Sequence, residues 1–509
     1  MAVLSNSIAA KLFLIPNFLL FSFFHLILLL SLLLPFSKVV ASRPSTVKFV
    51  PGFDGPLPFE LETGYVGVDE SEDVQLFYYF AKSYSNPRDD PLILWLTGGP
   101  GCSCFSAFAY EVGPLIFKDV QGNGSLPTVV MNPNAWTKGA SMIFVDLPVG
   151  TGFSYSRTSA AAHSTDLQSS AQAYEFLRKW LIDHPEFLSN PFYVAGDSYS
   201  GITVPIVAHL ISDGNEVGNK PFINLKGYIL GNPVTFLHGD ANYAIPFAHG
   251  MGLISDELYE SLQRNCKGEY MNADPSNAVC YNDVQAYSQV INFLCVWTLH
   301  IATQICLPCP SFSQCISGLQ QAHILEPLCG FASPRPHQLF GERRSLYHEN
   351  AKLLRPKQLP CASNRIDGYR LSYRWLDDDG VREALRIKKG SIGPWVRCNL
   401  RLNYAYTIAD SYQYHVKLST KGYRSLIYSG DHDMIVPFLG TQAWIKSLNY
   451  SIVDDWRSWA VEGQVAGYTR SYSNGMTYAT IKGGGHTAAE YKPFECSIMF
   501  ERWISRKPL

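Results

Sequence analysis

The feature that most constrains the fold is a series of short apolar runs that each end at Gly or Pro. Residues 92–96 are followed by a Thr-Gly-Gly-Pro-Gly turn, residues 141–145 by Asp-Leu-Pro, and residues 192–195 by Gly-Asp-Ser. Residues 228–230 and 425–428 form two more such runs. Apolar runs of this length, closed by turn residues, are typical of the buried strands of a parallel sheet.

A helix is predicted between two of these strands. Over Asp166–Asp183 the hydrophobic residues recur at helical spacing, and Ser164 and Thr165 are candidate N-caps. Strand, helix and strand in alternation predict an α/β fold, in which a mostly parallel central sheet is flanked by helices.

The composition excludes several classes of protein. Of 509 residues, 47% are hydrophobic and 17% are charged, which argues against disorder. The formal net charge is −2, so a nucleic-acid binder or a polybasic membrane module is not expected. The length fits two to four domains, or one large α/β domain with an insertion.

The N-terminus predicts entry into the secretory pathway. Residues 18–34 are nearly all apolar and are followed by small residues, so we interpret 1–42 as a cleaved signal peptide. The alternative is a retained membrane anchor. Two acceptor sequons, at Asn123 and Asn449, and 12 cysteines fit an oxidising compartment. We therefore expect a vacuolar or extracellular protein, without stable membrane insertion once the signal is cleaved.

The strand pattern is interrupted in the middle of the chain. From about Thr235 to Pro360, Cys, Pro and Gln accumulate, and the sheet pattern is expected to resume near Arg374. We predict a core in two halves, 43–234 and 367–509, with a cap inserted at 235–366. Residues 331–360 are interpreted as a surface linker that is a candidate processing site.

A nucleophile is predicted at the end of one strand. Gly196-Asp197-Ser198-Tyr199-Ser200 approximates the Gly-x-Ser-x-Gly elbow, in which a sharp turn exposes the serine hydroxyl above the sheet. The alternative is an ordinary serine in a strand-to-helix turn. Such a hydroxyl needs a base that is itself held by an acid.

Two later loops supply the acid and the base in the expected chain order. Ser429-Gly430-Asp431-His432-Asp433 follows one strand, and a Gly-Gly-Gly turn before His486 follows the apolar residues 478–481. Two backbone donors are needed for the oxyanion. One is expected from the residue after the nucleophile, Tyr199, and one from the glycine turn at 98–101. A P-loop is excluded because no Lys-Ser/Thr follows these glycines.

These segments resemble the serine carboxypeptidase family and, within it, the plant serine carboxypeptidase-like acyltransferases. The resemblance runs from about Phe53 to Trp503 and implies the α/β-hydrolase fold. It implies a triad of Ser198, Asp433 and His486, and oxyanion donors at Gly99 and Tyr199. No cofactor and no metal are expected. The segments that carry the resemblance are Leu96–Ser103, Gly196–Tyr199, Ser429–Asp433 and Gly483–Thr487.

The resemblance also separates two activities. Peptidase members hold the substrate carboxylate with an Asn before the Gly-Gly pair, a Glu before the nucleophile and a second Glu, where this chain has Thr97, Asp197 and Glu111. Thr offers fewer donors than Asn, and Asp is one methylene shorter than Glu. These changes favour transfer of an acyl group from a glucose ester to an acceptor. A carboxypeptidase acting on peptide C-termini and a catalytically inactive binding protein remain the alternatives.

The cysteines have an implied pattern of bridges. The resemblance implies Cys102–Cys398, Cys266–Cys280 and Cys329–Cys361, although sequence alone leaves the connectivity open. Cys104 and Cys496 are expected to be free and buried. Cys306 and Cys309 invite a zinc or redox interpretation, but the ligand spacing around them does not fit a metal site.

One stretch departs from the family pattern. Residues 290–314 contain no Asp, Glu, Lys or Arg, and without them the flanking residues continue one amphipathic helical pattern. The stretch begins at Val, whose codons start with GT, and ends at Gln, which can be encoded CAG. Our hypothesis is a retained intron in the gene sequence. The alternative is a genuine apolar loop that packs on the cap.

Overall fold

The computed structural model describes residues 45–118, 126–237, 239–285, 316, 318–326 and 363–509. Among the described residues, no helix is both long enough and apolar enough to span a membrane. Asn449, the second sequon, is exposed just after a helix. The expectations that lie outside the described residues concern the signal peptide at 1–42, Asn123, the stretch 290–314, Cys306 and Cys309, the linker 331–360 and the Cys329–Cys361 pair.

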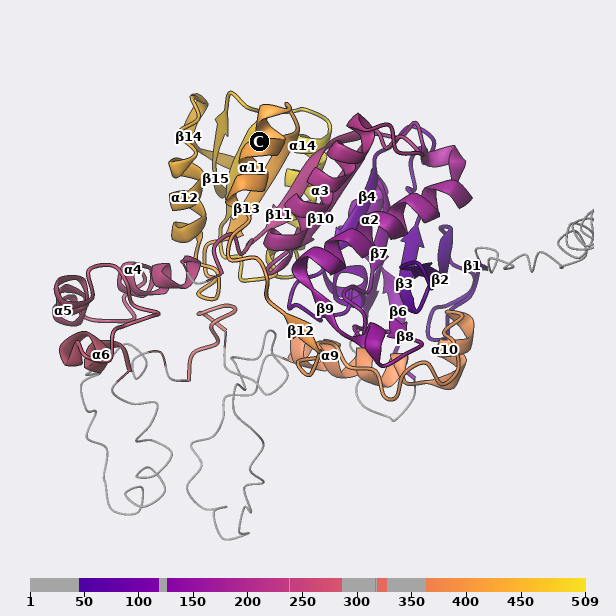
Figure 1. Ribbon diagram of the computed structural model, residues 1–509, viewed down its shortest axis with the longest axis horizontal. Coiled ribbons are helices and arrows are strands. Elements are labelled where there is room, and N and C mark those ends of the chain that lie inside the picture. Colours follow the sequence, from indigo (N-terminus) through magenta and orange to yellow (C-terminus); the bar gives the residue numbers. More distant parts are fainter. Residues whose placement is uncertain (1–44, 119–125, 238, 286–315, 317, 327–362) are drawn as a thin grey trace, which may run out of the picture. The chain divides into compact units, whose positions relative to one another are not determined.

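A sheet of twelve strands dominates the described chain (Figure 1). The strand order is β1-β2-β3-β7-β4-β10-β11-β13-β16-β15-β14, and β8 pairs with β3. Pairings from β7 through β16 are parallel, whereas those toward β2 and β14 are antiparallel. The strands are β1 (Ser45–Val47), β2 (Leu61–Val68), β3 (Val74–Ala81), β4 (Leu92–Leu96), β7 (Ser141–Val145), β8 (Tyr155–Ser156), β10 (Phe192–Asp197), β11 (Leu225–Gly231), β13 (Arg424–Gly430), β14 (Ile452–Val461), β15 (Gln464–Tyr472) and β16 (Met476–Ile481).

Helices cover both faces of this sheet. Strand residues alternate between the faces, so Leu94 packs with one group of helices and Trp95 with the other. The predicted architecture, a mostly parallel sheet flanked by helices, is confirmed. On the Leu94 face lie α2 (Asp166–Asp183), α3 (Ser200–Glu216), α11 (Tyr412–Thr420) and α12 (Phe438–Ser447); on the other lie η1 (Ala107–Glu111), α9 (Ser363–Leu376), α10 (Asp379–Ala384) and α14 (Pro493–Ile504).

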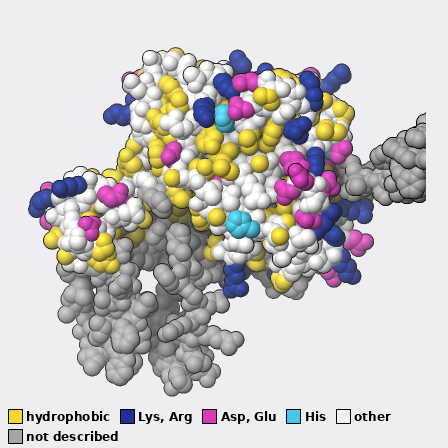
Figure 2. Space-filling model, in the orientation of Figure 1, with side chains coloured by type: hydrophobic (Ala, Val, Ile, Leu, Met, Phe, Trp, Pro, Cys, Tyr) yellow, Lys and Arg dark blue, Asp and Glu magenta, His cyan; other side chains and the backbone are white. Residues whose placement is uncertain are grey.

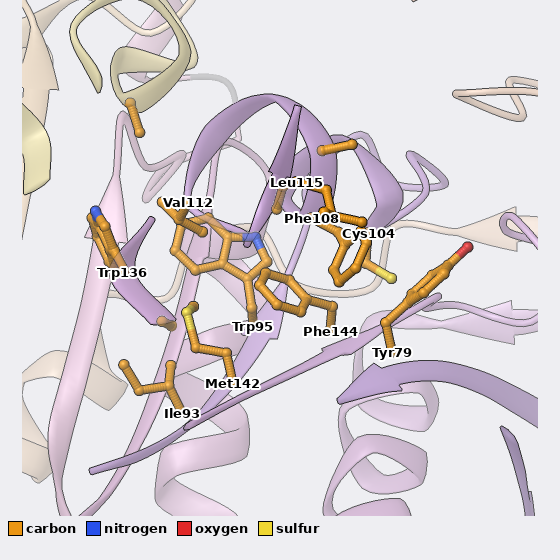
Figure 3. Packing of buried hydrophobic residues seen from close by; sticks show 14 of the residues in the cluster. Tyr79, Ile93, Trp95, Cys104, Phe108, Val112, Leu115, Trp136, Met142 and Phe144 are labelled. Carbon is orange, nitrogen blue, oxygen red and sulfur yellow. The ribbon is translucent and has the colours of Figure 1, made fainter. Parts of the chain in front are cut away.

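Aromatic packing fixes η1 over the sheet. The rings of Trp95 and Trp136 meet edge to face with centroids 5.7 Å apart, and Phe108 of η1 meets Phe144 at 5.6 Å (Figure 3). Such pairs add to the hydrophobic gain of burying the rings. Because Glu111 is the last residue of η1, this packing also fixes where its carboxyl lies.

The predicted elements are found where the sequence placed them. The five apolar runs are strands β4, β7, β10, β11 and β13, and the helix predicted at Asp166–Asp183 is α2 with the same bounds. Thr165 is its N-cap, because its side chain accepts a hydrogen bond from the Gln168 amide at 3.2 Å. The smaller elements are β5 (Leu115–Phe117), β6 (Val129–Met131), η2 (Trp136–Lys138), η3 (Ala160–Ala162), β9 (Ser164–Thr165), η4 (Pro185–Phe187), β12 (Tyr404–Ala405) and α13 (Ala488–Tyr491).

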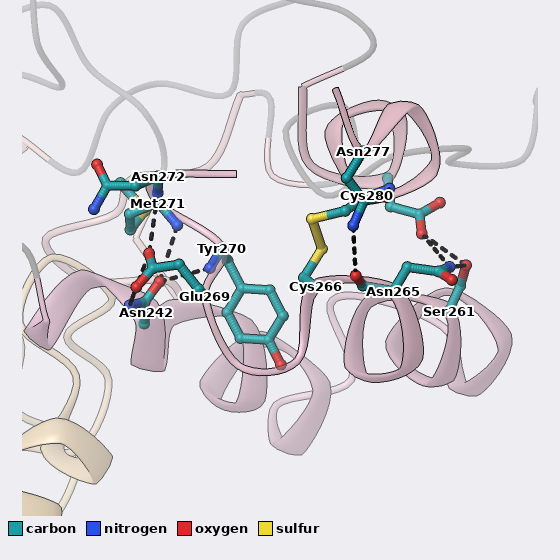
Figure 4. Close-up of a disulfide and its surroundings, with 11 residues drawn as sticks. Asn242, Ser261, Asn265, Cys266, Glu269, Tyr270, Met271, Asn272, Asn277 and Cys280 are labelled. Atoms are coloured by element: carbon teal, nitrogen blue, oxygen red, sulfur yellow. Dashed lines mark hydrogen bonds between the residues drawn. A yellow bond between two sulfur atoms is a disulfide. The ribbon is translucent and has the colours of Figure 1, made fainter. Parts of the chain in front are cut away.

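After β11 the described chain leaves the sheet and forms helices. These are η5 (Asp240–Tyr243), α4 (Ala244–Gly250), α5 (Asp256–Cys266) and α6 (Ala278–Gln285). They bury a small apolar cluster of their own. A disulfide between Cys266 and Cys280 joins α5 to α6, and Asn277 donates a hydrogen bond to the Asn265 carbonyl beside it at 2.8 Å (Figure 4).

The expectation that the sheet resumes near Arg374 is wrong. Arg374 lies in α9, and the next strand of the large sheet is β13, which begins at Arg424. The residues between them form α9, α10, the short β12 and α11. Their sequences mix polar and aromatic residues. Because a half-buried strand has a similar mixture, the sequence pattern did not distinguish these helices from strands.

Charges of both signs are mixed on the surface. On the face shown in Figure 2, lysine and arginine side chains are interspersed with aspartate and glutamate. One such group joins Lys421 to Asp213 and Glu216, each at 2.8 Å. Local neutralisation of this kind fits the small formal net charge of −2.

Candidate active site

The site lies where neighbouring parallel strands end. The glycine turn at 98–101 follows β4, Ser198 follows β10, Asn232 follows β11, Asp433 follows β13 and His486 follows β16. These strands are adjacent in the order β4-β10-β11-β13-β16 and are all parallel. Their carboxyl ends therefore share one edge of the sheet, which is where α/β proteins place their sites.

Ser198 occupies a strained turn. Its φ is +56°, in the left-handed region that a residue with a side chain rarely adopts, and its amide donates to the Gly231 carbonyl at 2.9 Å. Only glycine fits beside it, because a Cβ on Gly98 would lie 2.7 Å from the Ser198 Cβ. This is the geometry of a nucleophile elbow.

His486 connects the serine to an aspartate. The Ser198 hydroxyl lies 2.7 Å from Nε2 of His486, and Nδ1 of His486 lies 2.8 Å from Oδ2 of Asp433. Burial alone would lower the pKa of His486, but the Asp433 charge and hydrogen bond outweigh it, so the pKa is raised. Serine, histidine and aspartate are thus brought together with the spacing that a proton relay requires.

Several N–H groups surround the Asp433 carboxylate. Besides His486, Asn232 Nδ2 donates to it at 2.8 Å, the Ile435 amide at 2.8 Å and the Val436 amide at 3.3 Å. Asp433 has no exposed surface, so these bonds offset the cost of burying its charge. Asn232 was not singled out from the sequence, although a Gly-Asn-Pro end of a predicted strand was the available signal.

The other aspartate of the loop has a different role. Asp431 binds Nδ1 of His432 at 2.6 Å and accepts the Gly483 amide at 2.7 Å. It therefore links the loop after β13 to the loop after β16. The geometry places Asp433, the second Asp of the motif, against His486.

A segment of the predicted cap, residues 320–324, contacts both of these loops through its backbone. The His486 amide donates to the Ala322 carbonyl at 2.7 Å, the Met434 amide to the Gln321 carbonyl at 2.9 Å, and the Ile324 amide to the His432 carbonyl at 3.1 Å. We call residues 320–324 the strap. The His323 side chain adds to these contacts, because its Nε2 lies 3.2 Å from the Gly483 carbonyl oxygen and its ring stacks on that of His432 at 5.5 Å. Sequence analysis did not single out the strap.

The glycine turn packs closely against the nucleophile elbow. A Cβ on Gly98 would lie 2.7 Å from the Tyr199 nitrogen, so the glycine turn and the elbow are in close contact. Within the described part of the chain, neither the Gly99 nor the Tyr199 amide donates to a backbone carbonyl. Both are available as donors to an oxyanion.

A group of buried carboxyls lies next to the glycine turn. Asp197 and Glu111 are both buried, and Oδ1 of Asp197 accepts the Gly98 amide at 3.3 Å. Burial raises the pKa of Asp197 to about 6, against the opposing effects of His486, the Gly98 amide and Arg397. Burial also raises the pKa of Glu111 well above its ordinary value, and the charges of Asp197 and Glu490 add to this.

Arg397 brings positive charge to these acids. Its guanidinium is buried and lies 4.2 Å from the ring centroid of Tyr369, and its charge lowers the pKa of both Asp197 and Glu111. Sequence analysis did not name Arg397. Its place next to Cys398, a residue implied to bridge to the glycine turn, was the available signal.

The disulfide beside the site joins the two halves of the chain. Cys102 is bonded to Cys398, 296 residues later, as the resemblance implied. Cys104 and Cys496 are free and buried, which confirms that expectation. Among the described residues, no group of His, Cys, Asp and Glu side chains is arranged to hold a metal ion.

One cavity lies away from this site. It has a volume of about 500 Å³ and lies between η5, α4 and α12, where Asp240, Tyr243, Tyr270 and Trp444 line it. A narrow crevice lies at the site itself, lined in part by Thr97, Tyr199 and Tyr404.

Comparison with known proteins identifies the family. The serine carboxypeptidase family model matches residues 51–506. The chain belongs to the serine carboxypeptidase family. It is 52% identical to serine carboxypeptidase-like 2 of Arabidopsis thaliana, over 95% of this chain and 97% of that protein, and 49% identical to serine carboxypeptidase-like 17 of the same plant, over 96% and 97%.

A solved structure shares the fold. The crystal structure of Kex1(delta)p, a prohormone-processing carboxypeptidase from Saccharomyces cerevisiae, matches with a TM-score of 0.65 and 20% identity. The match covers 88% of this chain and 92% of that one. It supports the α/β-hydrolase fold that a serine carboxypeptidase is expected to have.

Proposed function

We propose that this member of the serine carboxypeptidase family is an acyltransferase. It moves an acyl group from a glucose ester to an acceptor through an acyl-enzyme on Ser198, with His486 as base and Asp433 as its partner. Gly99 and Tyr199 supply the oxyanion donors. The predicted signal peptide supports a location in the secretory pathway, in the vacuole or outside the cell.

The geometry gives each residue a step. Nε2 of His486 takes the Ser198 proton while Oγ attacks the ester carbonyl, and the two amides bind the resulting oxyanion. The intermediate collapses, and His486 returns the proton to the departing sugar oxygen. His486 then takes the proton of the acceptor, which attacks the acyl-enzyme. The bond between the acyl carbon and Oγ breaks, and His486 returns that proton to Ser198.

The proposal rests on the hydrogen bonds that Thr97 and Asp197 accept from neighbouring residues of the chain. Trp95 Nε1 donates to the Thr97 hydroxyl at 3.2 Å, and the Gly98 amide donates to Asp197 at 3.3 Å. Thr97 therefore has a single O–H to offer a ligand, and Asp197 is directed toward the glycine turn. A site with these contacts is poorly equipped to hold the free carboxylate of a peptide.

One observation favours carboxypeptidase activity as a second candidate. Burial raises the pKa of both Glu111 and Asp197, so at acid pH the pair is protonated. A neutral carboxyl donates a hydrogen bond, and a peptide C-terminus can accept it. This candidate predicts release of amino acids from blocked dipeptides, fastest at acid pH.

Substrate assays on the purified protein separate these functions. It is given a panel of acyl glucose esters with alcohol acceptors and, separately, a blocked dipeptide. We expect transferred acyl product that is lost in Ser198→Ala and retained in the neighbouring Ser200→Ala control. Release of amino acid without transfer would support the second candidate, and no turnover of either substrate would indicate an inactive protein.

A double substitution tests the carrying observation directly. Thr97→Asn with Asp197→Glu restores the peptidase-type residues. We expect hydrolysis of the blocked dipeptide to rise relative to acyl transfer. If the ratio does not change, these two positions do not set the preference.

A further inference from the structure

Asp166 is a buried carboxylate that the mechanism above does not use. It is the first residue of α2 and has no exposed surface. Its Oδ1 accepts the hydroxyls of Tyr199 at 2.5 Å and Tyr404 at 2.7 Å. Its Oδ2 accepts the amides of Thr407 at 2.5 Å and Ile408 at 2.9 Å. These four hydrogen bonds offset the cost of burying the negative charge of Asp166.

Tyr199 is the residue through which Asp166 reaches the site. It follows the nucleophile directly, and its backbone amide is one of the two oxyanion donors. Its buried side chain is held at the far end by Asp166, and its ring meets those of Tyr404 at 6.3 Å and Tyr406 at 5.6 Å. A residue fixed both at the strained elbow and at its hydroxyl has little freedom to rotate its amide.

The same contacts fasten one segment, residues 397–408, which we call the brace. At its start, the Cys398–Cys102 disulfide ties it to the glycine turn. The Asn399 amide donates to the Gly101 carbonyl at 2.8 Å, and the Ser103 amide donates to the Arg397 carbonyl at 2.7 Å. The beginning of the brace therefore holds the turn that carries Gly99.

The end of the brace is held by Asp166. Tyr404 and the amides of Thr407 and Ile408 all donate to it. Tyr404 also pairs with Ser164 in the short ladder of β12 and β9, next to the start of α2. One segment is thus tied to both oxyanion donors, to Gly99 through the disulfide and to Tyr199 through Asp166.

We propose that Asp166 is a positioning residue for the oxyanion site. It aligns the Tyr199 amide and anchors the brace that holds the glycine turn. The inference rests on the oxyanion donors of the proposed function. It applies whichever acyl acceptor the enzyme uses, because acylation of Ser198 passes through the same tetrahedral intermediate.

The test compares two single-hydroxyl deletions on adjacent rings. Tyr199→Phe removes the bond to Asp166 and keeps the ring. Tyr406→Phe is the matched control, because Tyr406 is 57% exposed and its hydroxyl makes none of the hydrogen bonds that Asp166 accepts in the described structure. Each variant is assayed for kcat and KM on an acyl ester and for the affinity of a boronic acid, which forms a tetrahedral anion on the serine.

We expect Tyr199→Phe to lower kcat and boronic acid affinity together by about tenfold with KM unchanged, since losing a whole oxyanion donor costs about 10²–10³. Tyr406→Phe should change neither quantity. Asp166→Asn should lower kcat and boronic acid affinity more than Tyr199→Phe does. If Asp166→Asn does not fold, Tyr199→Phe still tests the proposal. Equal behaviour of Tyr199→Phe and Tyr406→Phe would overturn the proposal.

The experiment separates this inference from the proposed function. If the wild-type protein turns over no acyl ester, the proposed function fails. The rate at which an organophosphonate labels Ser198 still reports the oxyanion site in that case. A lower labelling rate in Tyr199→Phe than in Tyr406→Phe supports the positioning role, and equal rates contradict it.

Discussion

Two buried carboxyls, Asp433 and Glu111, have contrasting surroundings. Asp433 has no exposed surface and accepts hydrogen bonds from Asn232, His486 and two backbone amides. Glu111 is almost as buried, but its neighbours include the acids Asp197 and Glu490 together with Arg397. Burial raises the pKa of Glu111, and the two acids raise it further.

The difference shows that partners, and not burial alone, set what an acid can do. A carboxylate surrounded by N–H donors can carry a fixed negative charge, which a histidine base needs behind it. Nearby acids raise the pKa of a carboxyl, so its charge changes with pH at less acidic values than usual. The first environment suits proton transfer, and the second suits recognition that responds to acidity.

Replacing each acid by its amide tests the difference between Asp433 and Glu111 most directly. We expect Asp433→Asn to lower kcat by about 10⁴, because His486 loses both its charge partner and the acceptor that fixes its tautomer. Glu111→Gln should stay within about tenfold of the wild type, since the amide is neutral and burial already raises the pKa of the Glu111 carboxyl and favours its neutral form. Steady-state kinetics on an acyl ester, with thermal melts to check folding, measure both changes.

Comparable losses in the two variants would contradict the distinction. If Asp433→Asn melts early, the rate at which a serine-directed phosphonate labels the folded fraction replaces kcat as the readout. The comparison then still rests on reactivity at Ser198.

The next largest effect is expected where the strap meets the catalytic loops. A Cβ on Gly485 would lie 2.4 Å from the Ala322 carbonyl oxygen and 2.9 Å from the His323 Cβ. We expect Gly485→Ala to displace the strap or the His486 loop and to lower kcat by about 10–100-fold, because small errors in the position of a base are costly.

Gly139→Ala is the matched control for this prediction. An added Cβ at Gly139 meets nothing within 4 Å, and the residue is not at positive φ. It should leave kcat unchanged. If Gly485→Ala is equally harmless, the strap does not position His486.

The sequence was sufficient for the parts of the site that follow strand periodicity. The loops that carry Ser198, Asp433 and His486 each follow an apolar run, and parallel strands bring their carboxyl ends to one edge. The choice of Asp433 over Asp431 came from the family resemblance. Residues that act through tertiary packing were missed. Arg397 lies in a loop far from any predicted strand end, and Asn232 had no chemical role until Asp433 was placed beside it.

The strap and the point at which the sheet resumes were also not predicted correctly from the sequence. Ala322 contributes a carbonyl to the His486 amide, and any residue would offer that group, so no pattern marks it. The sheet was expected to resume near Arg374, but helices α9 and α10 intervene and the strand begins at Arg424. Half-buried helices on a sheet and half-buried strands both mix apolar and polar residues, which is why periodicity failed there.

A smaller effect concerns the charge of Asp197. Its pKa is raised to about 6 by burial, so it is neutral below that pH and negative above it. An anionic inhibitor such as a free carboxylic acid should therefore bind more weakly as pH rises through about 6. In Asp197→Asn we expect this dependence to weaken, leaving the parts due to Glu111 and His486, whose charges change in the same sense. Inhibition constants between pH 4.5 and 7.5 measure it, and an unchanged profile would remove Asp197 from the ligand site.

The smallest effect, on stability, tests the Glu111 side of the comparison without any substrate. A carboxyl whose pKa is higher in the folded than in the unfolded state binds its proton more tightly when folded. The wild type therefore has its full stability below the ordinary glutamate pKa of about 4.3 and loses part of it as the pH rises above that value.

The Glu111→Gln variant has no carboxyl to ionise at this position, so it avoids the loss. Its free energy of unfolding should match the wild type near pH 4 and exceed it by a growing margin as the pH rises toward 7. Melts of both proteins across this range, with the exposed Glu70→Gln as control, supply the measurement. A constant difference at all pH values would mean that Glu111 ionises as freely in the folded protein as in the unfolded chain, and the contrast with Asp433 would then have to rest on geometry alone.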